Sequence, residues 1–110
     1  MRHVATRHLS EPVLLILMSL ADQPRHGYGL MKDIETLSGE RVRLSTGTLY
    51  GALRRLLEDG WIERFQQEDT SREKQAYRLT AAGREKLQQE LDRMKQLMRA
   101  ASVRLRRREA

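Results

Sequence analysis

The sequence predicts a mainly α-helical fold with one small β-hairpin, followed by a long C-terminal helix. Three observations predict this fold class. Three helix patterns, each opened by a turn or capping residue, come before any strand pattern. Two short strand-like segments then flank a polar stretch. The last part of the chain repeats apolar residues at alternating steps of four and three.

Composition limits the chain to one small domain and excludes several kinds of site. The sequence has 110 residues and no cysteine, which excludes disulfides, thiolate zinc sites and iron–sulfur clusters. Its longest apolar run, residues 13–20, is shorter than the roughly 20 residues of a membrane span. The net charge of +6 and the pI of about 10.3 favour a polyanionic partner. We therefore expect a soluble cytoplasmic protein that makes no membrane contact.

The first helix is expected to begin after Ser10. A serine side chain can accept a free amide proton of the first turn, and Pro12 is tolerated there. Residues 13–20 form the buried part of this helix, and residues 22–24 end it.

Two amphipathic helices come next, with no strand expected before or between them. The second helix is predicted at residues 27–37. Ser45 can cap a third helix, which the Asp59–Gly60 pair ends. The predicted core-facing residues of these helices are Leu30, Ile34, Leu37, Leu49, Leu53, Leu56 and Leu57.

A hairpin is expected after the third helix. Its strands are predicted at residues 61–65 and 76–79, joined by a polar loop at residues 66–74. Three helices followed by a hairpin is the order of a winged helix-turn-helix. In that fold the third helix enters the DNA major groove, and the hairpin, or wing, lies along the phosphate backbone. We assign residues 9–80 to this domain.

A dimerisation helix is expected at residues 81–106, capped by Thr80 and roughly 39 Å long at about 1.5 Å per residue. Its heptad-like pattern predicts a homodimer, and an ordinary amphipathic helix that forms no coiled coil is the alternative. Residues 1–8 and 107–110 are expected to be flexible. The predicted dimerisation residues are Leu87, Leu91, Met94, Leu97, Met98, Ala101 and Leu105.

The third helix carries the main candidates for contact with DNA. Gly47 and Gly51 lie one turn apart, although each costs about 1 kcal/mol against alanine inside a helix. Close approach of a phosphate or base edge would explain them. The alternative is that Gly47 is merely a first-turn residue and that Gly51 packs on a neighbouring helix. Tyr50 and Arg54 share one face and could donate to phosphate or guanine. Alternatively, Tyr50 is half-buried and Arg54 pairs with Glu58.

Further contacts are expected around this helix. Tyr28 and Lys32 lie near the start of the second helix, which crosses the DNA backbone, and burial of Tyr28 in the core is the alternative. The wing loop offers basic residues among acidic neighbours, and the hydroxyl residues near position 45 also serve as caps. The predicted DNA-binding residues are Tyr28, Lys32, Ser45, Thr46, Thr48, Tyr50, Gly51, Arg54, Arg72 and Lys74.

No enzyme, metal site or cofactor is predicted. No nucleophile, base and orienting group occur at a recognisable spacing, and the three histidines do not form a metal set. Charges of both signs alternate along the last helix, which is typical of a solvated surface with ion pairs.

Six short strings in the chain carry a further signal. They are Pro24-Arg25-His26-Gly27-Tyr28-Gly29, Gly47-Thr48-Leu49-Tyr50, Leu53-Arg54-Arg55-Leu56, Asp59-Gly60-Trp61-Ile62, and Tyr77-Arg78-Leu79-Thr80 with Gly83-Arg84. Their order and gaps resemble the PadR family of bacterial transcriptional regulators, over residues 13 to 84. The short C-terminal region is similar to that of compact members with one dimerisation helix.

The resemblance implies a winged helix-turn-helix, a dimer made by the C-terminal helix, and repression at a palindromic operator. It also implies that repression is often relieved by a small hydrophobic or phenolic effector. By matching positions, the residues that face DNA would be Tyr28, Ser45, Thr48, Tyr50, Gly51 and Arg54, with Lys74 in the wing.

We therefore expect a sequence-specific, dimeric repressor that binds double-stranded DNA. One alternative is a winged-helix adaptor whose basic face meets an acidic protein. Another is a ligand sensor in which Met94, Leu97 and Met98 line an effector pocket between protomers.

Overall fold

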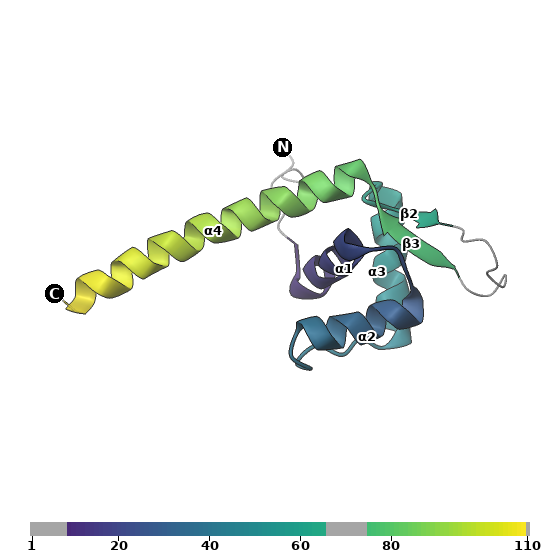
Figure 1. Ribbon diagram of the computed structural model, residues 1–110, viewed down its shortest axis with the longest axis horizontal. Helices are drawn as coiled ribbons and strands as arrows, with labels where there is room; N and C mark the ends of the chain where they lie inside the picture. The colour runs from purple at the N-terminus through teal and green to yellow at the C-terminus, as the bar shows by residue number, and fades with distance from the viewer. Residues whose placement is uncertain (1–8, 66–74, 110) are drawn as a thin grey trace.

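The computed structural model describes residues 9–65 and 75–109, which form a mainly helical domain and one long projecting helix (Figure 1). The expected wing loop and the first eight residues lie outside these ranges. In chain order the elements are α1 (Glu11–Asp22), β1 (Arg25–His26), α2 (Gly27–Leu37), α3 (Thr46–Asp59), β2 (Ile62–Phe65), β3 (Ala76–Leu79) and α4 (Ala81–Glu109).

The core lies where the first three helices meet the sheet. The apolar stripes predicted for α2 and α3 face inward, except that Leu57 is half-buried and Leu37 at the end of α2 is exposed. The α1 segment at residues 13–20 supplies the third wall, as its long apolar run predicts. The side chains that are almost completely buried include Ile16, Leu17, Leu30, Ile34, Leu49, Leu53 and Ile62.

The sheet has three antiparallel strands in the order β1-β3-β2. In it, β2 and β3 pair with Ile62 opposite Leu79, as the predicted hairpin requires. The expectation that no strand precedes the third helix was wrong. Strand β1 lies before α2 and pairs with β3, so that Arg25 of β1 is opposite Tyr77 of β3. Pro24 disfavours a helical conformation at the residue before it, so the link after α1 is extended and reaches the edge of β3.

Local capping bonds set the helix boundaries as predicted. The Ser45 hydroxyl accepts the Thr48 amide at 3.1 Å at the start of α3. Gly60 ends this helix with φ of 79°, and its N–H donates to the Leu57 carbonyl at 3.1 Å. The Thr80 hydroxyl accepts the Gly83 amide at 3.0 Å and donates to the Gly60 carbonyl at 2.7 Å. Thr80 therefore ties the start of α4 to the end of α3.

Helix α4 packs its first turns on α1 and then extends well beyond the rest of the domain (Figure 1). Its end at Glu109 lies past the expected end at residue 106, so residues 107–109 continue the helix. Residue 110, whose flexibility was also predicted, is outside the described ranges. Among the helices of the described ranges, none has both the length and the apolar character that crossing a membrane requires.

Candidate nucleic-acid interface

The outer face of α3 is open and unpaired. No atom of a packed neighbour lies within 4 Å of the place where a methyl group would sit on Gly47 or Gly51. Packing among residues 9–65 and 75–109 therefore does not explain the two glycines, and within this part of the chain Gly51 does not pack on a neighbouring helix. A glycine surface at a helix start allows close approach of a phosphate or a base edge.

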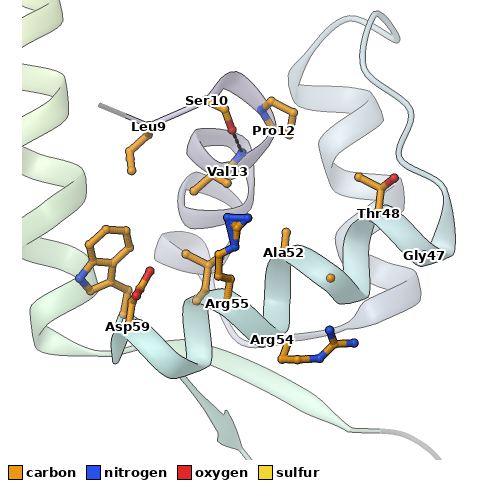
Figure 2. A pocket seen from close by; sticks show the side chains of 13 residues that line it. Leu9, Ser10, Pro12, Val13, Gly47, Thr48, Ala52, Arg54, Arg55 and Asp59 are labelled. Atoms are coloured by element: carbon orange, nitrogen blue, oxygen red, sulfur yellow. Dashed lines mark hydrogen bonds between the residues drawn. The ribbon is translucent and has the colours of Figure 1, made fainter. Parts of the chain in front are cut away.

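The arginines of α3 make no ion pair within the described residues. Arg54 is exposed, and the alternative pair between Arg54 and Glu58 is not formed. Arg55, which the sequence did not single out as a contact, is equally exposed and extends toward Val13 of α1 (Figure 2). Neither arginine is held in an ion pair within the described residues, so both guanidinium groups are available for contact with a partner.

A shallow cleft of about 860 Å³ runs between α3 and the start of α1 (Figure 2). Its walls combine apolar side chains such as Val13 and Trp61 with polar groups of α3 such as Thr48 and Arg55. Because Gly47 and Gly51 also border it, the cleft is continuous with the open face of the helix.

The hydroxyl residues at the start of α3 divide into a cap and an exposed pair. Ser45 is the cap, and its hydroxyl also donates to the Thr48 hydroxyl at 3.0 Å. Thr46 and Thr48 are exposed on the first turn. The amides of this turn and the positive end of the helix dipole lie beside them.

The start of α2 presents a second part of the same surface. Tyr28 is 70% exposed, which rules out the alternative of a core position within this chain. The Lys32 ammonium lies 5.8 Å from the centre of its ring, one turn further along α2. An aromatic hydroxyl and a cation therefore stand together at the end of α2 that a helix-turn-helix brings to the DNA backbone.

Tyr50 differs from the other predicted contacts because its hydroxyl points into the protein. The phenol packs against Gly27 at the start of α2, and the residue is 42% exposed. Tyr77 of β3 is buried, and its pKa is raised by this burial and by nearby Tyr50, while Arg64 lowers it. The alternative that Tyr50 is half-buried beside the core thus describes its position.

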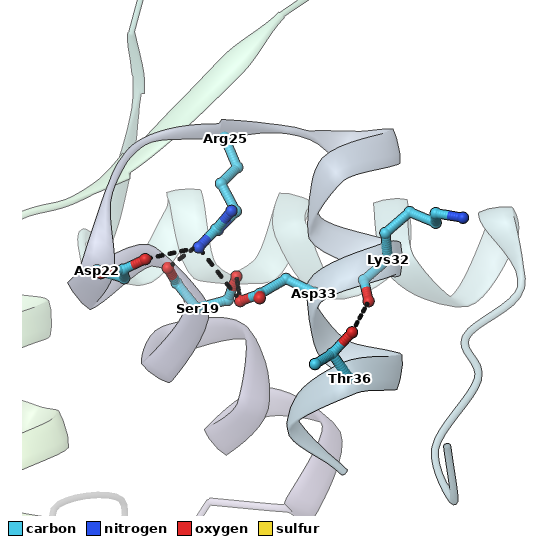
Figure 3. A network of polar contacts seen from close by, with 6 residues as sticks. All are labelled: Ser19, Asp22, Arg25, Lys32, Asp33 and Thr36. Atoms are coloured by element: carbon cyan, nitrogen blue, oxygen red, sulfur yellow. Dashed lines mark hydrogen bonds and ion pairs between the residues drawn. The ribbon is translucent and has the colours of Figure 1, made fainter. Parts of the chain in front are cut away.

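A polar network that the sequence did not reveal holds α2 in place (Figure 3). The buried Ser19 of α1 donates its hydroxyl to Asp33 of α2 at 2.7 Å. Arg25 of β1 reaches both Asp22, at 2.9 Å, and Asp33, at 3.4 Å. The only sequence signal was a serine within the buried stripe of α1. The network joins α1 and β1 to α2, with Arg25 before Tyr28 in the sequence and Asp33 after it.

The wing contributes less to this surface within the described residues. Arg72 and Lys74, both predicted contacts, lie outside the described ranges. Arg78 of β3 pairs with Glu63 at 2.7 Å and lies 4.7 Å from the centre of the Phe65 ring. The positive charge of Arg78 is therefore engaged in contacts within the hairpin.

The predicted dimerisation residues divide at the point where α4 leaves the domain. Leu87 is only 7% exposed and belongs to the core of its own protomer. The other six are exposed and form an apolar stripe on the projecting part of the helix: Leu91, Met94, Leu97, Met98, Ala101 and Leu105. We call these six residues the α4 stripe.

A helix-turn-helix whose third helix presents an open face with exposed arginines, followed by an antiparallel hairpin, is typical of the winged-helix transcriptional regulators as a class. Residues 16–89 match the model of the PadR-like family of transcriptional regulators. The chain belongs to this family, which confirms the resemblance and the expectation of a regulator that is not an enzyme.

Individual relatives agree with this assignment. The chain is 37% identical over 86 residues to the transcriptional regulator Rv3488 of Mycobacterium tuberculosis, covering 78% of each protein. It is 40% identical over 84 residues to an uncharacterised 37.1 kDa protein in transposon Tn4556 of Streptomyces fradiae. That match covers 76% of this chain and 23% of the Streptomyces protein.

Solved structures support the fold. A PadR family regulator of Clostridium difficile superimposes with a TM-score of 0.72 at 21% identity, covering 87% of this chain and 99% of the other. A transcriptional regulator of Clostridium thermocellum gives a TM-score of 0.69 at 26% identity, covering 83% and 89%. These likenesses confirm a mainly helical winged-helix fold with a long C-terminal helix.

Proposed function

We propose that the protein is a homodimeric repressor that binds a palindromic operator in double-stranded DNA through α3 and the start of α2. The observation that carries this proposal is the open face of α3, where Gly51 leaves the backbone accessible and Arg54 has no acidic partner among the described residues. Tyr28 and Lys32 extend the same surface to the flanking phosphates. A chromosomal partner implies action in the cytoplasm.

A second copy of the chain is the partner that we propose for the α4 stripe. Met98 is 64% exposed and Leu105 is 69% exposed, which is unusual for large apolar side chains on a single projecting helix. A two-fold dimer would bury the same stripe on both protomers. The two α3 helices would then read half-sites about one helical turn, roughly 34 to 36 Å, apart.

Release by a small hydrophobic effector is a part of the proposal that rests on the methionines of this stripe. Met94 and Met98 are flexible and can repack around a ligand between protomers. Loss of operator affinity on addition of a ligand would distinguish a sensor from a constitutive repressor.

Selection of bound sequences from a random duplex library tests the proposal directly. The purified protein at near-physiological salt should enrich a palindrome with half-sites one turn apart. The Arg54→Ala variant should lose discrimination at one or two base positions, worth about 1 to 3 kcal/mol each. Arg99→Ala, on the exposed surface of α4, serves as a control with the same change of charge.

Binding that is independent of sequence and falls steeply with salt would contradict the proposal, because the net charge alone would then explain it. In that case a winged-helix adaptor that binds an acidic protein would become the better explanation.

A further inference from the structure

We propose that Tyr50 is a positioning residue. Its phenol occupies the space where a side chain on Gly27 would lie, and it thereby fixes the orientation of α3 relative to the start of α2 and the β1-β3-β2 sheet. This assigns Tyr50 a role different from the direct phosphate contact that its sequence position suggests. The consequence for DNA binding rests on the proposed function, whereas the packing contact itself does not.

The contact between Tyr50 and Gly27 is the first line of support. Gly27 is buried as the first residue of α2. A methyl group added to it would overlap the Tyr50 hydroxyl oxygen and lie 2.9 Å from Cζ. By contrast, a methyl group on Gly29 would find its nearest neighbour, Arg25 Cβ, at 4.0 Å. Of these two glycines in the first turn of α2, only Gly27 is required by Tyr50.

The neighbourhood of Tyr77 is the second line of support. Tyr77 lies in β3, directly opposite Arg25 of β1, and β1 leads straight into Gly27. Tyr50 also contributes to the raised pKa of Tyr77, which agrees with a position of Tyr50 near this junction. The Tyr50 side chain therefore lies where α2, α3 and the sheet meet.

The position of the contact between Tyr50 and Gly27 allows it to control the rotational orientation of α3. Leu49 and Leu53 hold one face of α3 in the core, and Tyr50 adds a contact outside this core face. Tyr50 lies outside the core, and the hydroxyl end of its ring packs against Gly27. Rotation of α3 about its axis would therefore break this contact. Bidentate contacts to base edges demand such a fixed orientation.

A double-mutant cycle between Gly27→Ala and Tyr50→Leu tests the proposal. Unfolding by urea is measured on the free protein, and affinity is measured for the selected operator and for a random duplex. Gly29→Ala is the matched control, because it adds the same methyl group two residues away where space exists.

Gly27→Ala alone should weaken operator binding about tenfold and random-duplex binding little, because orientation of α3 matters only for base contacts. In the Tyr50→Leu background the same substitution should change operator affinity by less than about twofold, because the leucine leaves room for the methyl group. The free energies of unfolding should show the same non-additivity. Gly29→Ala should leave both affinities nearly unchanged, and it should not lower the free energy of unfolding, because alanine is the better residue in a helix and space exists for its methyl group.

Additive free energies of unfolding would overturn the packing contact, whether or not an operator is found. Operator effects that simply multiply would show that Gly27 and Tyr50 act on DNA independently, which would also overturn the proposal. An equal loss of operator and random-duplex affinity would do so too. If the unmutated protein selects no operator, the proposed function fails, and the unfolding cycle still decides whether Tyr50 and Gly27 are coupled.

Discussion

Gly51 is a residue that packing among the described residues does not explain. It stands in the middle of α3, where alanine would support the helix better, and no neighbouring atom occupies the space beside it. Nothing within the described part of the chain therefore calls for a glycine at this position. The proposed approach of DNA to the backbone supplies a reason.

The first prediction is that Gly51→Ala makes the protein more stable and less able to bind DNA. Removal of glycine from the helix should raise the free energy of unfolding by about 1 kcal/mol. The added methyl group should meanwhile lower operator affinity by obstructing close approach. Urea unfolding and fluorescence anisotropy with labelled operator measure the two effects. Gln96→Ala, on the exposed α4, is a control for a gain in helix propensity alone. Unchanged operator affinity would mean that the glycine does not serve DNA.

Residue-level reasoning from the sequence was successful where the cause is local. Exposure of Thr48 and Arg54 follows from the helical period once the buried leucines are assigned. It failed where the partner lies far along the chain. The network of Arg25 with Asp33 and the contact of Tyr50 with Gly27 depend on how α1, α2 and α3 pack together.

Among the helices and strands, those set by local residues were predicted, and the strand that depends on a distant partner was not. The bounds of α2 and α3 follow from the residues that cap or end them, such as Ser45 and Gly60, and these act within one turn. The strand β1 has only two residues and exists because β3 lies beside it. No periodic pattern of two residues can reveal such a strand.

The junction between the wing and α4 depends on one close approach. The Trp61 carbonyl accepts the Thr80 amide at 3.1 Å, and a methyl group on Gly83 would overlap this same carbonyl oxygen. Backbone atoms cannot move aside as a side chain can. Glycine is therefore required at this position if α4 is to begin where it does.

The second prediction follows from this junction. Gly83→Ala should lower the free energy of unfolding by about 1 to 3 kcal/mol, as overpacking in a tight contact does. Thermal or urea unfolding measures the loss. Gly47→Ala provides the matched control, because its methyl group would meet no neighbouring atom. If Gly83→Ala were as stable as the control, the close contact between α4 and Trp61 would not limit the fold.

At the scale of the whole molecule, the protein consists of a packed domain and a helix that leaves it. The longest dimension is 61 Å against 37 and 23 Å, which reflects the projection of α4. Leu87 lies in the core, while the α4 stripe continues the same helix face into solvent. The proposed dimer would bury this stripe.

The third prediction is that Met98→Glu yields a folded monomer with much weaker operator binding. A charge in the middle of the stripe would have to be buried at the proposed dimer interface, which is strongly unfavourable. Each monomer would still hold one α3, but a palindrome requires two. Sedimentation equilibrium measures the mass, and anisotropy measures the binding. Gln96→Glu adds the same charge on the opposite face of α4, and it should remain dimeric. A dimeric Met98→Glu protein would place the interface elsewhere.

The continuity of α4 from the core to its far end also sets how tolerant such a dimer would be to changes in its target. A helix of 29 residues is about 43 Å long, so a tilt of about 5° at its base moves the tip by roughly 4 Å. That shift is close to the rise of one base pair, about 3.4 Å. An unbroken helix anchored at Gly83 would therefore fix the spacing between the two α3 helices of such a dimer. Inserting or deleting a single base pair between the half-sites would require α4 to bend at its base.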